Sequence, residues 1–174
     1  MRNIFIGLLF IFLDFHIDFD ATRIGLIPDF IGYIIMINGL NELSFKNMRF
    51  SKIRPFAVGM AIYTGVLYAF DLLAVSFNLG GLSLLLGLAS TIISLYISYN
   101  IVMGVKDMEL AYSQQLNGDN LLTIWKVVAV LSLAIYLLFF IPALGILCVI
   151  GNIVVAIIFL VSFNKTKNLY YAQN

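Results

Sequence analysis

The sequence predicts an all-α polytopic membrane protein: one integral membrane domain over residues 1–174, a bundle of six transmembrane helices arranged as three helical hairpins. The first observation is composition, because hydrophobic residues make up 62% of the chain, charged residues 11%, and the mean hydropathy is +1.03. A soluble domain has about 45–50% apolar and about 25% charged residues. The other two observations are a succession of apolar spans and a one-sided distribution of basic residues.

Turn and proline signals separate the spans. Pro28, Pro55 and Pro142 lie at the predicted starts of spans two, three and six, and the turns at 78–81 and 117–120 precede spans four and five. The N-terminal segment has no small-x-small cleavage site, so we expect a retained helix rather than a signal peptide. The spans are expected at about residues 3–19, 28–43, 56–77, 82–105, 121–141 and 144–163.

The basic residues predict the orientation. With six spans, only Arg23 lies on one side of the membrane, and the positive-inside rule then places both termini in the cytoplasm. Trp125 beside Lys126 is expected to anchor the fifth span at the inner headgroups. We therefore expect a multi-pass protein of the bacterial cytoplasmic membrane. The nine basic residues on the cytoplasmic side would be Arg2, Lys46, Arg49, Lys52, Arg54, Lys106, Lys126, Lys165 and Lys167.

Asp29 is the most informative residue, because the stretch around it otherwise has the composition of a membrane span. Lipid cannot solvate a carboxylate, so Asp29 must lie at a boundary, be paired or protonated, or face a wet cavity. One interpretation is a helix that starts at the interface, with Pro28 at its first position and the acid complementing the helix dipole. The other is a buried ligand or proton site, with Gly32 and Tyr33 on the same helix face.

Asp71 strengthens the second interpretation, because it lies near the outer end of span three, at a depth similar to that of Asp29. Two carboxylates at one level of a bundle could bind a cation, or share a proton because like charges in a low dielectric cannot both ionise. A pairing of Asp71 with Arg23 is the alternative. The predicted ligand-binding or ion-binding residues are Asp29, Asp71, Tyr33 and Asn152.

A weaker candidate is the alternation of Asp14, His16, Asp18 and Asp20. In an extended chain these side chains would share one face and could hold a divalent metal, whereas in a helix only Asp14 and Asp18 would. Neither arrangement has the spacing of a recognised metal motif. An interfacial loop is therefore favoured, and no metal or cofactor is predicted.

Small residues suggest close helix contacts. Gly32 and Gly39 are seven positions apart, which suits close approach of two helices. Span four carries a stripe of small and hydroxylated residues, for which a packing seam is favoured over a pore lining. The members of the stripe are Ser83, Gly87, Ser90, Thr91, Ser94 and Ser98.

The segments Ile24–Tyr33 (IGLIPDFIGY) and Asn38–Leu43 (NGLNEL) resemble a class of small bacterial multipass membrane proteins. The resemblance covers about the first 45 residues and implies neither an activity nor catalytic residues.

The sequence has no Gly-Lys-Ser/Thr phosphate loop, His-Glu-x-x-His or Gly-x-Ser-x-Gly motif, and its single cysteine, Cys148, excludes an intrachain disulfide. The favoured prediction is a non-enzymatic accessory or regulatory protein that acts through helix contacts. The alternative is a small transporter or a cation- or proton-coupled carrier that uses Asp29 and Asp71. The expected partners are the lipid bilayer and either a second copy or another membrane protein, with no nucleic acid.

Overall fold

The computed structural model describes residues 1–12, 16–19, 22–25, 28–73, 81–138 and 141–173. Six helices make up most of this part of the chain, which confirms the all-α class, and two short strands depart from it. The elements in chain order are α1 (Arg2–Phe12), β1 (His16–Phe19), β2 (Thr22–Gly25), α2 (Asp29–Ser44), α3 (Met48–Leu72), α4 (Gly81–Tyr112), α5 (Gly118–Leu137) and α6 (Pro142–Ala172).

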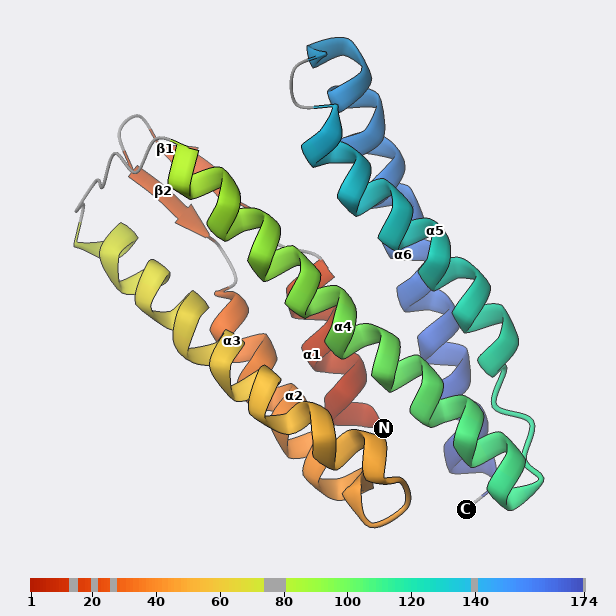
Figure 1. Cartoon of the computed structure of the whole chain (residues 1–174). Coiled ribbons are helices and arrows are strands. Elements are labelled where there is room, and N and C mark those ends of the chain that lie inside the picture. The colour runs from red at the N-terminus through yellow and green to blue at the C-terminus, as the bar shows by residue number, and fades with distance from the viewer. Residues whose placement is uncertain (13–15, 20–21, 26–27, 74–80, 139–140, 174) are drawn as a thin grey trace.

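The helices form a closed circuit. Each helix packs against the next one along the chain, and α6 returns to pack against α1. In Figure 1 both termini lie at one end of the bundle, with the short connections at 45–47 and 113–117. We call this the terminal end, and we call the opposite end, which holds the strands and the α5–α6 connection, the distal end. Because α2 packs against α3 as well as α1, this packing does not single out three separate hairpins.

Four helices, α3 to α6, are long and apolar enough to cross a membrane, with mean hydropathies of 1.3, 1.8, 1.8 and 3.0 over their most apolar windows. Helix α1 has 11 residues and α2 has 16. At about 1.5 Å per residue these two helices reach roughly 16 Å and 24 Å, whereas the hydrocarbon core is about 30 Å thick. Among the described helices, the four long ones are therefore those that length and composition fit to a membrane.

The first helix is shorter than the predicted span over 3–19. It ends at Phe12, and His16–Phe19 forms strand β1, which pairs antiparallel with β2. In the register of this hairpin, His16 lies opposite Gly25 and Phe19 lies opposite Thr22. Polar and apolar residues alternate from His16 to Phe19, and a period of two is the period of a strand. This alternation predicts the local structure better than apolar composition does.

The third helix begins earlier than predicted. Pro55 lies inside α3, which starts at Met48 after the cap residue Asn47, whose side chain accepts a hydrogen bond from the Arg49 backbone N–H at 2.8 Å. Proline has no N–H, so the carbonyl of Ser51 loses its helical partner at this point. Ser51 is exposed near the terminal end, where that loss costs least. Much of the basic cluster between spans two and three is therefore helical.

Helices α1 and α2 cross closely at glycines. A Cβ atom added at Gly7 would lie 2.7 Å from the carbonyl oxygen of Gly32, and one added at Gly39 would lie 2.7 Å from the backbone nitrogen of Ile4. Such distances leave no room for a side chain. The prediction that Gly32 and Gly39 support close helix contact is confirmed.

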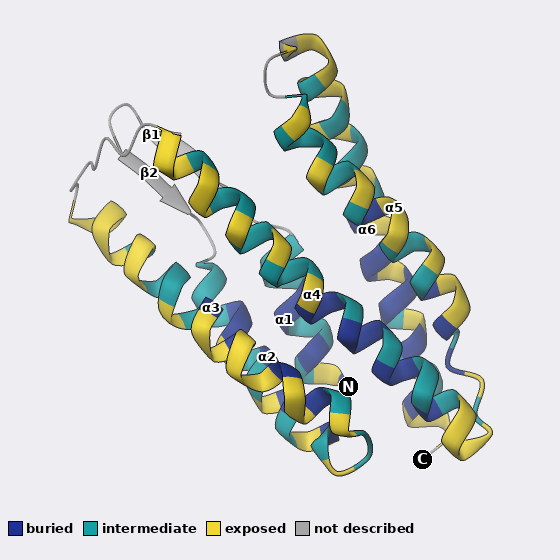
Figure 2. Ribbon diagram, in the orientation of Figure 1, coloured by how far each residue is buried: buried dark blue, intermediate teal, exposed yellow. Residues whose placement is uncertain are grey.

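Burial is uneven along the bundle. Figure 2 shows the buried residues gathered toward the terminal end, whereas the distal parts of α3 to α6 are largely exposed or intermediate. Large apolar side chains such as Ile62, Leu82, Leu85 and Ile153 are exposed there. In a bilayer these side chains would face lipid. The terminal half is thus tightly packed, and the distal half is more open.

Candidate functional site

A cavity of about 500 Å³ lies where the helices diverge toward the distal end. Residues from α1, α2, α3, α4 and α5 line it, so it lies within the circuit of helices and not on the outside of one pair. We call it the polar cavity. Its lining consists of Ile11, Phe12, Asp29, Tyr33, Met60, Tyr63, Thr64, Leu67, Ser83, Leu86, Gly87, Ser90, Thr91, Ser94, Leu95 and Ser132.

Asp29 is the first residue of α2 and lines the polar cavity. Pro28 precedes it in an extended conformation (φ −66°, ψ 125°), so the chain enters the helix there and not before. A carboxylate in the first turn complements the partial positive charge of a helix N-terminus. The oxygen Oδ1 of Asp29 is inaccessible to solvent. The two interpretations of Asp29 therefore hold together: it starts a helix, and it faces a cavity.

Tyr33 lies one turn after Asp29 and is only 2% exposed. Its phenol is at hydrogen-bonding range of the Ser94 side chain on α4 and within electrostatic reach of Asp29. On the facing helix α3, the Thr64 hydroxyl donates a hydrogen bond to the Met60 carbonyl at 2.8 Å. The expected shared face of Asp29 and Tyr33 is therefore part of the cavity wall.

The stripe of small and hydroxylated residues on α4 lies in two different surroundings. In its distal part all members from Ser83 to Ser94 line the polar cavity, whereas Ser98 is buried in the packed half. Trp125 donates a hydrogen bond from Nε1 to the Ser98 Oγ at 3.0 Å, and its ring lies 4.9 Å from that of Tyr99. The predicted packing seam is thus correct only near Ser98. Trp125 also packs into the bundle, and its expected role as an interfacial anchor stays a prediction.

Helix α5 closes the cavity on one side. The hydroxyls of Tyr136 and Thr91 are 2.8 Å apart, and Ser132 donates a hydrogen bond to Asn152 Oδ1 on α6 at 3.3 Å. Asn152 bonds between helices as predicted, but it lies behind Ser132 and does not line the cavity.

The structure does not bring Asp71 into the polar cavity. Asp71 lies in the last turn of α3, is exposed, and is absent from the cavity lining. The polar residues that line the cavity with Asp29 are tyrosines, serines and threonines.

The candidate metal residues cannot be placed in the same way. Asp14 and Asp20 lie outside the described residues, and His16 and Asp18 belong to strand β1, of which the backbone is described. An extended backbone is the first of the two arrangements considered for this segment. Within the described ranges, no three His, Cys, Asp or Glu side chains come together as a metal site.

Sequence patterns missed Tyr63 and Thr64, which lie opposite Asp29. A signal was present, because Asp29 precedes the end of α2 at Ser44 by 15 residues and Thr64 follows the start of α3 at Met48 by 16. In two antiparallel helices joined by a short connection, equal distances from the connection mean equal depth. Counting from the connection identifies both residues only with α3 beginning at Met48, since the same count from the expected start at residue 56 leads to the neighbourhood of Asp71.

The electrostatics of the polar cavity are set by one group. Among its described lining residues, Asp29 is the only one with an ionisable carboxyl or basic group, and the other polar side chains are hydroxyls. Hydroxyl oxygens and aromatic faces both accommodate positive charge. An ionised Asp29 would therefore contribute a negative charge to a wall that is otherwise polar through hydroxyls. No family model matches the chain, and no curated protein or solved structure is significantly similar to it.

Proposed function

We propose that this chain is a small carrier of the bacterial cytoplasmic membrane that binds an organic cation in the polar cavity, with Asp29 as the charged contact. The observation that carries this proposal is a carboxylate facing a hydroxyl-lined cavity among apolar helices. Ionisable groups at membrane depth are costly and commonly mark ligand or ion pathways. The cavity favours this function over that of an accessory protein, which would need only helix contacts.

The lining favours an organic ammonium over a bare metal ion. A hard metal ion such as Ca²⁺ takes about six to eight oxygen ligands, several of them carboxylates, whereas this cavity offers one carboxylate. Tyr33 and Tyr63 supply aromatic rings, which attract quaternary and protonated amines. The volume of about 500 Å³ is within the usual size of small-molecule sites, about 300–1,000 Å³.

The position of the cavity suggests access from one side. The cavity lies in the distal half, and the packed terminal half separates it from the terminal end. In the proposed orientation, with both termini in the cytoplasm, the distal end faces outward, and we assign the cavity to an outward-facing state of the carrier. Release to the cytoplasm would then require the terminal half to open.

The test is tetramethylammonium binding to the purified full chain in lipid nanodiscs, measured by isothermal titration calorimetry. We expect Asp29→Asn to lower the affinity at least about tenfold, because a charge-assisted contact contributes about 1.5–3 kcal/mol. Asp71→Asn is the matched control and should bind as wild type does, since Asp71 is exposed and outside the cavity lining.

Two results would contradict the proposal: no tetramethylammonium binding by the wild type, or equal binding by wild type and Asp29→Asn. Uptake of labelled tetramethylammonium into proteoliposomes then separates a carrier from a binding protein. Uptake should depend on Asp29 in the same way as binding.

A further inference from the structure

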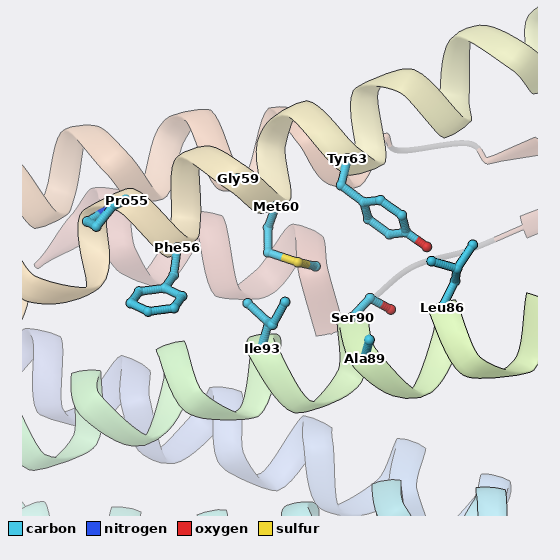
Figure 3. Close-up of a pocket in the computed structure, with 9 residues that line it drawn as sticks. All are labelled: Pro55, Phe56, Gly59, Met60, Tyr63, Leu86, Ala89, Ser90 and Ile93. Carbon is cyan, nitrogen blue, oxygen red and sulfur yellow. The ribbon is translucent and has the colours of Figure 1, made fainter.

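A second hollow lies on the outside of the bundle between α3 and α4. It has a volume of about 460 Å³, and Figure 3 shows the side chains of the two helices facing each other across it. We call it the α3–α4 groove. Its lining consists of Pro55, Phe56, Gly59, Met60, Tyr63, Leu86, Ala89, Ser90 and Ile93.

The α3–α4 groove is apolar and open to the surroundings of the bundle. Apart from Tyr63 and Ser90, its lining side chains have no polar atoms that form hydrogen bonds of ordinary strength. Phe56 is 44% exposed and Leu86 39%, and Gly59 is exposed as well. Since α3 and α4 are both long and apolar enough to cross a membrane, the groove would open toward the hydrocarbon chains of lipids.

The groove and the polar cavity are adjacent. Met60, Tyr63, Leu86 and Ser90 line both hollows. In Figure 3 the Tyr63 hydroxyl and Ser90 lie toward one end of the groove, and Pro55 lies at the other end. The two hollows thus lie side by side, the polar, acid-containing one inside the bundle and the apolar one on its outside.

This shape identifies the chemical class of the ligand. Building on the proposed function, we infer that the organic cation is a single-chain cationic amphiphile drawn from the surrounding bilayer. Its ammonium head occupies the polar cavity at Asp29, and its hydrocarbon chain lies in the α3–α4 groove. The polar lining and the Asp29 carboxylate match the ammonium head of such a molecule, and the apolar lining of the groove matches its hydrocarbon chain.

The dimensions suit one extended chain. Along α3, Tyr63 follows Pro55 by eight residues, which is about 12 Å at about 1.5 Å per residue. The chain would run from the head at the distal side toward the terminal end. In the proposed orientation this is the direction in which a lipid of the outer leaflet points, so the ligand could enter sideways without inverting.

The experiment compares a head with and without a chain, using tetramethylammonium and octyltrimethylammonium below its micellar concentration. Both are titrated into wild type and Gly59→Leu in nanodiscs, with empty nanodiscs to subtract partitioning. Gly59 is suited to this test, because it lines the groove and a Cβ added there meets no atom within 4 Å, so we expect leucine to occupy the groove and leave the fold intact. Ala89→Leu fills it from α4, and Ile62→Phe adds apolar bulk to a part of α3 outside the groove.

We expect Gly59→Leu and Ala89→Leu to weaken octyltrimethylammonium binding about tenfold, since fewer than two buried methylenes account for such a factor. Both variants should bind tetramethylammonium as wild type does, and Ile62→Phe should resemble wild type with both ligands. Asp29→Asn should weaken the binding of both ligands.

Each contrary result has its own meaning. If tetramethylammonium binds through Asp29 but filling the groove leaves octyltrimethylammonium binding unchanged, the amphiphile inference is wrong and the proposed function stands. If neither ligand depends on Asp29, both fail. If Gly59→Leu converts a wild-type dimer to a monomer in size-exclusion chromatography, the groove is occupied by a second copy of the chain, and the inference is overturned.

Discussion

The terminal and distal halves of this bundle differ in what surrounds their small and polar residues. In the terminal half, Gly7 and Gly39 bring α1 and α2 into backbone contact, and Phe50 packs over Gly104. Toward the distal half, Gly59 near the middle of α3 has open space beside it, and Gly87 lines a cavity. The same residue type thus closes one half and leaves the other half open. The difference is one of packing, and the proposed binding site belongs to the more open part.

Polar contacts between helix ends reinforce the terminal half. The Asp107 carboxylate accepts hydrogen bonds from Arg49 Nε at 2.6 Å and Asn47 Nδ2 at 3.1 Å, which joins α4 to the start of α3. The Glu109 carboxylate accepts from the backbone N–H of Leu116 at 2.5 Å and of Gly118 at 3.1 Å. Glu109 therefore caps the start of α5.

The largest effect is expected from overpacking the terminal half. Gly39→Leu should lower the free energy of unfolding by about 3 kcal/mol or more, because the new side chain meets the Ile4 backbone and neither helix can move away freely. The measurement is thermal unfolding of the purified chain followed by far-ultraviolet circular dichroism. The matched substitution Gly59→Leu adds the same side chain where there is space, and it should leave unfolding nearly unchanged. If both variants lost the same free energy of unfolding, the two halves would not differ in packing as described.

An intermediate effect is expected at Trp125. Trp125→Phe removes the hydrogen bond to the buried Ser98 hydroxyl and part of the contact with Tyr99, which should cost about 1–2 kcal/mol. The loss should be the same in detergent micelles and in nanodiscs, because it arises within the bundle. A loss seen only in nanodiscs would instead support the interfacial anchor expected from the sequence.

Local signals in the sequence predict much of the terminal half and the start of the site. Composition and turn signals identify the four long helices α3 to α6. Glycine spacing identifies the α1–α2 contact, and Pro28 with Asp29 marks the first turn of α2. Each of these features depends on residues that are close together in the chain, and for that reason a single sequence reveals them.

The cavity could not be predicted in this way, because it depends on how far the helices diverge. Ser90 and Ser98 belong to one stripe on α4, yet the first lines a cavity and the second is buried against Trp125. Nothing in the residues themselves distinguishes the two positions. Asp71 is the opposite case. The sequence places it at a depth similar to that of Asp29, yet it does not line the cavity.

The smallest effect on stability is expected at the cavity wall, where Tyr136 and Thr91 join α5 to α4. Tyr136→Phe should cost less than about 1 kcal/mol, because a single neutral hydrogen bond between half-buried groups contributes about 0.5–1.5 kcal/mol and neither hydroxyl is sealed from solvent. Thr91→Val, which keeps the shape of the side chain, should cost about as much. The double variant should cost little more than either single variant, since both substitutions remove the same bond.

If the two losses add instead, each hydroxyl has a separate partner, and α4 and α5 are not joined at this point. If either single variant destabilises the chain as much as Gly39→Leu does, the distal half is a packed part of the fold, and its openness does not describe a binding region.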